Sequence, residues 1–230
     1  MMKSPKSTFG SSVASVRSSS RRSVPSRDDQ AYRMSFTTGG LFVNESVVIA
    51  GLHTCGQDWE ATLAVARQSG AVSAPRAASA QRVMREIVIR LQNLADTELF
   101  LLQDGDRGER LAILWLAVCR AYRFVGEFAV ELISDRFLSF RTDLAHDDFD
   151  LFLAAKAEWS PKLAGLSDAT RTKLRAVLFR ILKEAEIVSP VGRIEGTVLS
   201  PRLIALLAAS NPADLRVFPG AERFATGLKI

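Results

Sequence analysis

Basic side chains recur along one predicted helix, and they are the residues of this chain whose types and spacing could do chemistry. Lysine and arginine on a helix can pair with the phosphates of a nucleic acid while the helix approaches a groove. Five lie on the helix predicted over residues 168–186, one follows it and one begins the next helix: Arg171, Lys173, Arg175, Arg180, Lys183, Arg193 and Arg202. An amphipathic helix with a solvated basic face has the same pattern, so that alternative stays open.

The predicted helix has an apolar stripe that sorts these cations. At about 100° per residue, the stripe consists of Leu174, Val177, Leu178, Ile181, Leu182 and Ala185. Lys173, Arg180 and Lys183 lie on the opposite side. Arg171 and Arg175 lie at the flank of the stripe. We therefore predict a nucleic-acid-binding surface made of this helix, Arg193 and Arg202.

Catalytic chemistry is not expected. The two histidines (His53, His146) and two cysteines (Cys55, Cys119) do not stand at a spacing used for zinc or redox sites. The sequence has no nucleophile-elbow or phosphate-loop motif, and the glycine pair at 39–40 predicts only a turn or helix entry. We expect a protein that is not an enzyme and that needs no metal ion or cofactor.

Two groups of acids are interpreted structurally. Asp147, Asp148 and Asp150 stand at a predicted helix start, where carboxylates complement the helix dipole, and this interpretation is preferred to a metal site. Glu127 and Glu131 lie one helical turn apart with no evident partner base, which predicts a solvated face.

The net positive charge of the 230-residue chain lies at its N-terminus. Residues 1–33 hold seven basic and two acidic side chains, so their net charge of +5 equals that of the whole chain. Residues 1–30 contain ten serines and too little apolar surface to offset their chain entropy. We predict a disordered basic tail over 1–31, which either contacts phosphates or an acidic partner or is an unconstrained extension.

The body is predicted to be mainly α and multi-helical. We divide it into an N-terminal helical domain over 32–105, which could be helix-turn-helix-like, a central helical segment over 106–160 and a winged-helix-like domain over 161–230. Alternating residues near 187–199 predict a short β-ribbon as the wing. The predicted N-caps are Asp58, Ser79, Asp96, Ser167 and Ser200. The longest apolar run, Leu111–Cys119, is too short to span a bilayer, so we expect a cytoplasmic protein without membrane contact.

Several separate blocks of the body resemble one family. They are residues 35–42 (SFTTGGLF), 114–124 (LWLAVCRAYRF), 148–152 (DFDLF) with Lys156 and Trp159, and 170–175 (TRTKLR). Together, in this order between about Tyr32 and Pro219, they resemble the BrxA family of BREX bacteriophage-exclusion systems. The resemblance implies a helical fold of winged-helix character, no enzymatic activity, DNA binding and a bacterial defence operon that encodes a methyltransferase and an ATPase.

The resemblance does not assign single DNA-contacting residues, so the predicted site remains the helical face described above. The main hypothesis is a non-catalytic component of phage defence that binds double-stranded DNA. One alternative is a scaffold or assembly subunit that docks with other BREX proteins, such as the methyltransferase or ATPase. Another is an RNA-binding protein like NusB, to which the family has been likened.

Overall fold

The computed structural model describes residues 1, 32–72 and 76–226, and this part of the chain is mainly helical, as predicted. The chain divides into two units, Met1–Gln30 and Ala31–Ile230, and all helices of the described residues belong to the second. The predicted tail over 1–31, apart from its first residue, lies outside the described residues, and so does Pro75, where the sequence predicts a break. No helix in the described residues is long and apolar enough to cross a membrane.

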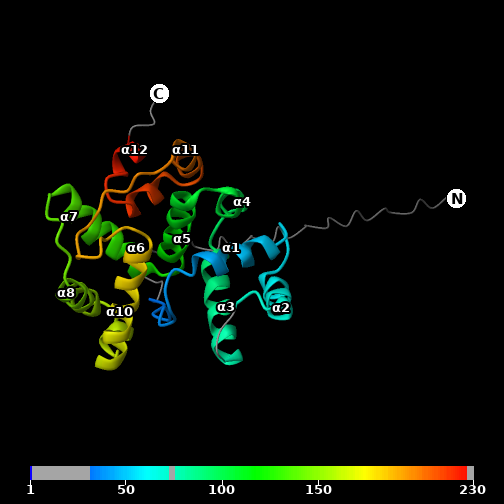
Figure 1. Ribbon diagram of the computed structural model, residues 1–230, viewed down its shortest axis with the longest axis horizontal. Coiled ribbons are helices and arrows are strands. Elements are labelled where there is room, and N and C mark those ends of the chain that lie inside the picture. The colour runs from blue at the N-terminus through cyan, green and yellow to red at the C-terminus, as the bar shows by residue number, and fades with distance from the viewer. Residues whose placement is uncertain (2–31, 73–75, 227–230) are drawn as a thin grey trace. The chain divides into compact units, whose positions relative to one another are not determined.

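The helices follow one another along the chain, and the longest connection between them spans residues 185–200 (Figure 1). The first five are α1 (Val43–Leu52), α2 (Trp59–Ser69), α3 (Ala77–Leu91), α4 (Asp96–Asp104) and α5 (Arg107–Ala121). Next come α6 (Arg123–Glu127), the π-helix η2 (Phe128–Ser134), α7 (Asp135–Leu138), α8 (His146–Ala157) and α9 (Pro161–Ala164). The last are α10 (Asp168–Glu184), α11 (Pro201–Ser210), the 3-10 helix η3 (Pro212–Val217) and α12 (Glu222–Thr226).

Helix α5 is the central element of the second unit. It packs against α3, α4 and α6, and in Figure 1 it lies between α1–α3 on one side and α8 and α10 on the other. Its residues 111–119 are all buried, as expected of a helix that is apolar around its whole circumference. Trp115 is fully buried and its Nε1 donates to the carbonyl of Val217 at 2.9 Å, so the indole N–H keeps a partner.

A buried polar network fixes the turn that precedes α1. Arg90 of α3 donates from Nη1 to the carbonyl of Gly40 at 2.7 Å and from Nε to Glu86 Oε1 at 2.9 Å. The hydroxyl of Tyr122, just after α5, donates to the same carboxylate at 2.6 Å. Burial, followed by the charge of Glu86, raises the pKa of Tyr122. The glycine turn is therefore tied to α3 and to the end of α5.

Three of the five predicted N-caps are confirmed. The side chains of Asp58, Ser167 and Ser200 accept backbone N–H groups of the helices that they precede. The N-caps predicted at Ser79 and Asp96 are wrong, because both residues already belong to their helices. At the N-terminus of α4 the side chain of Glu98 takes this role instead, because its Oε2 accepts the N–H of Ala95 at 2.8 Å.

The β-ribbon near 187–199 is not confirmed, and with it the winged-helix character. In place of strands, the described residues contain two isolated bridges, Val188 with Ile194 and Asp143 with Arg193. Within this segment Ser189 donates to the carbonyl of Arg193 and Glu195 to that of Ile187, whereas Ile194 donates to Thr142. Beyond this short pairing, Thr197 donates to Pro219. Because the pairing stops after Glu195, no continuous ladder extends to residue 199.

The solvated face expected at Glu127 and Glu131 is present only at Glu131, whose side chain is exposed. Glu127 is only partly exposed and accepts the hydroxyl of Tyr32 at 2.6 Å. Lys156 of α8 lies 2.8 Å from carboxylate oxygens of both Glu127 and Glu131. These acids therefore join η2 and its neighbour α6 to α8 and to the segment before α1.

Candidate nucleic-acid interface

The helix that carries most of the predicted site is α10, and its position follows from its sequence. Ser167 caps its N-terminus by accepting the N–H of Thr170 at 3.3 Å. The predicted stripe is buried, and the helix packs through it against α8 and α5 (Figure 1). The side of α10 away from this stripe therefore faces solvent.

Lys173 and Arg180 are the free cations of this solvent-facing side. They lie two turns apart on the same face of α10, and both are exposed. Neither has an ion-pair or hydrogen-bond partner among the residues that the structure describes. Lys183 is also exposed, and its Nζ donates only to the carbonyl of Pro190 at 3.3 Å. These three side chains are available to an anionic ligand.

Arg171 and Arg175 face α8 instead. Arg175 forms an ion pair with Asp150 of α8. Arg171 donates from Nη2 to the carbonyl of Ala164 at 3.2 Å, while its Nε is buried without a partner in the described part of the chain. Both line a pocket of about 260 Å³ between α8 and α10. The two arginines at the flank of the stripe therefore join helices as well as adding charge.

Arg193 and Arg202 are held by acids of other segments. Arg193 follows α10 and lies 3.6 Å from Asp143, with both side chains mostly exposed. Arg202, at the start of α11, lies 3.0 Å from Glu109 of α5 and 3.3 Å from Asp104 of α4. The hydrogen bond with Glu109 raises the pKa of Arg202. The structure thus gathers Lys173, Arg180 and Lys183 on one face and gives the other four predicted residues acidic or backbone partners.

Two arginines that were not predicted as site residues share a groove with this face. Arg107 and Arg110, in the first turn of α5, line a groove of about 760 Å³ together with Arg180 and Lys183 of α10. Their stretch of sequence, residues 104–150, has ten acids and six bases, so its net charge hid them. Their spacing of three residues places both on one face of a helix, and this was the available signal.

The acidic cluster at the start of α8 has structural partners. Asp148 accepts the N–H of Ala145 at 2.8 Å and forms an ion pair with Arg136 at 2.5 Å. Within the described residues, no group of three or more His, Cys, Asp or Glu is placed to hold a metal ion.

Phe179, which the helical wheel places away from the stripe, is nevertheless buried. Its ring centroid lies 4.6 Å from that of His146.

Comparison with known proteins bears on the whole body. The family model BrxA matches residues 30–211. The chain belongs to the BrxA family. A BREX protein BrxA of Escherichia coli O9:H4 (strain HS) is 27% identical over 194 residues, which cover 82% of this chain and 90% of the relative. A BREX protein BrxA of Paramagnetospirillum magneticum is 24% identical over 185 residues, covering 78% and 92%.

A solved structure shares the fold of this BrxA family member. The crystal structure of an uncharacterized protein from Magnetospirillum magneticum superposes with a TM-score of 0.70 at 23% identity. The superposition covers 82% of this chain and 99% of that chain. At this identity the likeness concerns the fold alone.

Proposed function

We propose that the chain is a non-catalytic DNA-binding component of a BREX-type bacteriophage-defence system. The observation that carries the proposal is the solvent-facing side of α10, on which Lys173 and Arg180 are exposed and without partners among the described residues. The relatives named BREX protein BrxA support the biological setting. The chemistry of the proposed site is charge pairing with phosphates, which needs no general base or nucleophile.

The dimensions of α10 suit a duplex. Seven residues of helix between Lys173 and Arg180 correspond to about 10 Å. Over that length duplex DNA presents about six negative charges. In this proposal α10 takes the place of the groove-approaching helix. The loop around the Val188–Ile194 bridge, which carries Arg193, takes that of a wing.

The test measures binding of two unrelated short duplexes across a salt series by fluorescence anisotropy. The double variant Lys173→Glu/Arg180→Glu is compared with Arg67→Glu/Arg85→Glu, which changes two exposed arginines on α2 and α3. We expect the first variant to weaken binding of both duplexes alike. It should also flatten the salt dependence by about one unit of slope for each phosphate that the variant no longer neutralises.

The tail needs its own control, because its charge alone can bind DNA non-specifically. Every measurement is repeated with the six lysines and arginines of residues 3–27 replaced by glutamine. If the tail-neutral protein does not bind either duplex at low salt, or if the two double variants behave alike, the α10 proposal is wrong.

A second candidate is an assembly subunit that docks with other BREX proteins. It is favoured by aromatic side chains left in solvent: Phe140 is 92% exposed and Trp159 is 87% exposed. The test is capture of the BREX methyltransferase or ATPase by the protein. Loss of capture in Phe140→Ser/Trp159→Ser, with capture retained in Lys173→Glu/Arg180→Glu, would support this candidate. A NusB-like role is separated by competition, because RNA would then displace duplex DNA.

A further inference from the structure

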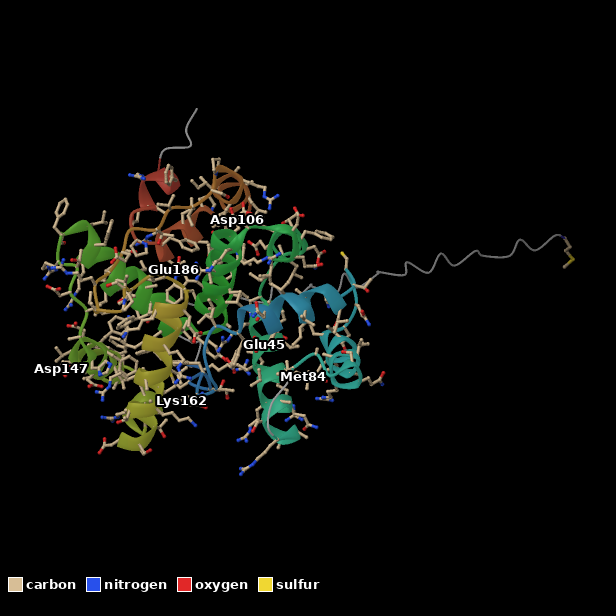
Figure 2. The ribbon with its side chains drawn as sticks, viewed as in Figure 1. Glu45, Met84, Asp106, Asp147, Lys162 and Glu186 are labelled. Carbon is tan, nitrogen blue, oxygen red and sulfur yellow. The ribbon has the colours of Figure 1, made fainter. Side chains whose placement is uncertain are left out.

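The groove between the glycine turn, α5 and α10 collects charge from three distant parts of the chain. Residues 39–45 form one wall, the first turn of α5 a second and the last turn of α10 a third. Its charged lining consists of Arg107, Arg110, Arg180 and Lys183 against the carboxylates Glu45 and Glu184. Figure 2 labels Glu45, which lines the groove from the first turn of α1, and Glu186, which follows the end of α10. The lining therefore carries a net positive charge.

Two acids of this region are engaged, Glu45 has no partner among the described residues, and part of the basic lining is unpaired. Glu184 accepts the backbone N–H of Leu41 at 2.5 Å, and Glu186 accepts from Arg107 at 2.5 Å. Arg110 donates from Nη2 to the carbonyl of Gln103 at 2.8 Å, but its Nε is buried with no partner in the described residues. Arg180 has no partner there at all. Arg180 therefore offers donors to an anion that enters the groove, whereas the buried Nε of Arg110 becomes available only if its side chain moves.

The glycine turn lets the backbone approach α10 closely. A Cβ atom on Gly40 would stand 2.2 Å from Glu184 Oε2. A Cβ atom on Gly39, whose φ is +64°, would stand 2.0 Å from the ring of Phe42. Any other residue at either position would need its neighbours to move, so the glycine pair shapes this wall. The N-terminus of α1 adds polar groups to this wall, because no described side chain accepts the backbone N–H groups of its first turn.

We propose that this groove binds a phosphate-bearing nucleotide unit. The cations suit the phosphate, and Arg107 and Arg110 can present planar guanidinium groups to its oxygens. The apolar side chains of Phe42, Val43 and Leu111 in the same lining suit a sugar or base. The volume of about 760 Å³ falls within the range of small-ligand sites. The phosphate belongs either to a DNA backbone or to a free nucleotide, and the proposal stands without DNA binding by α10.

The test uses the full chain and three probes: inorganic phosphate and ATP by calorimetry, and a short duplex by anisotropy. Arg107→Gln/Arg110→Gln removes two groove cations that do not belong to α10, and Arg67→Gln/Arg85→Gln is the matched control. We expect the groove variant to bind at least one probe about tenfold more weakly than the control does. Lysine at both positions should restore part of that affinity, which a general loss of folding would not allow. Lys183→Gln, which removes a single bond to a carbonyl, gives a second measurement if the double variant unfolds.

The three probes separate the two sources and the two proposals. Loss of ATP or phosphate binding assigns the site to a free nucleotide, and loss of duplex binding alone assigns it to a DNA backbone. If ATP binding depends on the groove while the wild type does not bind duplex, the groove proposal stands and the α10 proposal fails. If the groove variant and the control bind every probe equally well, the groove proposal is overturned, even where duplex binding depends on Lys173. It is also overturned if none of the probes binds.

Discussion

Replacing Gly40 with alanine should destabilise the protein through one particular bond. The new Cβ would stand 2.2 and 2.5 Å from the carboxylate oxygens of Glu184, so that side chain must withdraw. On withdrawing it gives up the N–H of Leu41, which it now accepts at 2.5 Å. Leu41 is 1% exposed, so its amide would be left without an acceptor in a buried position.

The magnitude follows from two opposing effects. Leaving a buried N–H unsatisfied costs about 1–3 kcal/mol. Replacing glycine by alanine offsets up to about 1 kcal/mol, because it restricts the unfolded chain. Taking about 2 kcal/mol for the unsatisfied N–H leaves a net loss of about 1–2 kcal/mol. For a protein of this size that corresponds to a fall in Tm of about 2–8 °C.

The assay is thermal and chemical unfolding of Gly40→Ala, Glu184→Ala and the double variant. In the Glu184→Ala background the acceptor is already gone, so alanine at position 40 should cost nothing or stabilise slightly. Gly51→Ala is the control, because that glycine is in α1 with its nearest neighbouring atom, Gln103 Oε1, 3.9 Å from the added Cβ. It should raise stability by about 0.5–1 kcal/mol. An equal loss from Gly40→Ala in both backgrounds would refute the assignment to Glu184.

Three further outcomes follow from buried or paired groups. Burial opposes ionisation of Glu127, but hydrogen bonds from three neighbouring side chains outweigh it and lower its pKa. Its stabilising effect is present above the unfolded pKa and lost as pH falls, so the stability gap to Glu127→Gln should close between about pH 5 and pH 3. Tyr122→Phe, which removes the buried donor to Glu86, should cost about 1–3 kcal/mol in urea unfolding; an unchanged midpoint would contradict the network. Burial raises the pKa of the Cys119 thiol and Cys55 is exposed, so a thiol reagent should modify Cys55 alone until denaturant is added.

Local patterns predicted α10 well because its determinants lie within the helix. Ser167 precedes it as a cap and the apolar stripe repeats at helical spacing, and both features are present in the structure. The strand expected near 193–199 failed for the opposite reason. Alternation of residue types favours a strand, but a strand also needs a partner that continues along it. Here Ile194 and Thr197 donate to different segments.

The groove could not be predicted from sequence, because its cations come from helices about 70 residues apart. Arg107 and Arg110 meet Arg180 and Lys183 only through the packing of α5 against α10. The charge of residues 104–150, which are acidic in sum, pointed away from Arg107 and Arg110. The glycine pair at 39–40 predicted only a turn. Its role depends on Glu184, which lies close to Gly40 in the fold but far from it in the sequence.

Ion pairing between acids and arginines around α10 explains how residues 34–230, which have no net charge, can present a basic face. In water at physiological salt a charge acts over about 8 Å, so a ligand senses local charges and not the sum over the chain. Around α10 arginines neutralise two acids, Asp150 through Arg175 and Glu186 through Arg107, whereas Glu184 accepts a neutral N–H and keeps its charge. Lys173 and Arg180 have no acidic partner among the described residues. The leftover charge at this surface is therefore positive, and the tail is not needed to produce it.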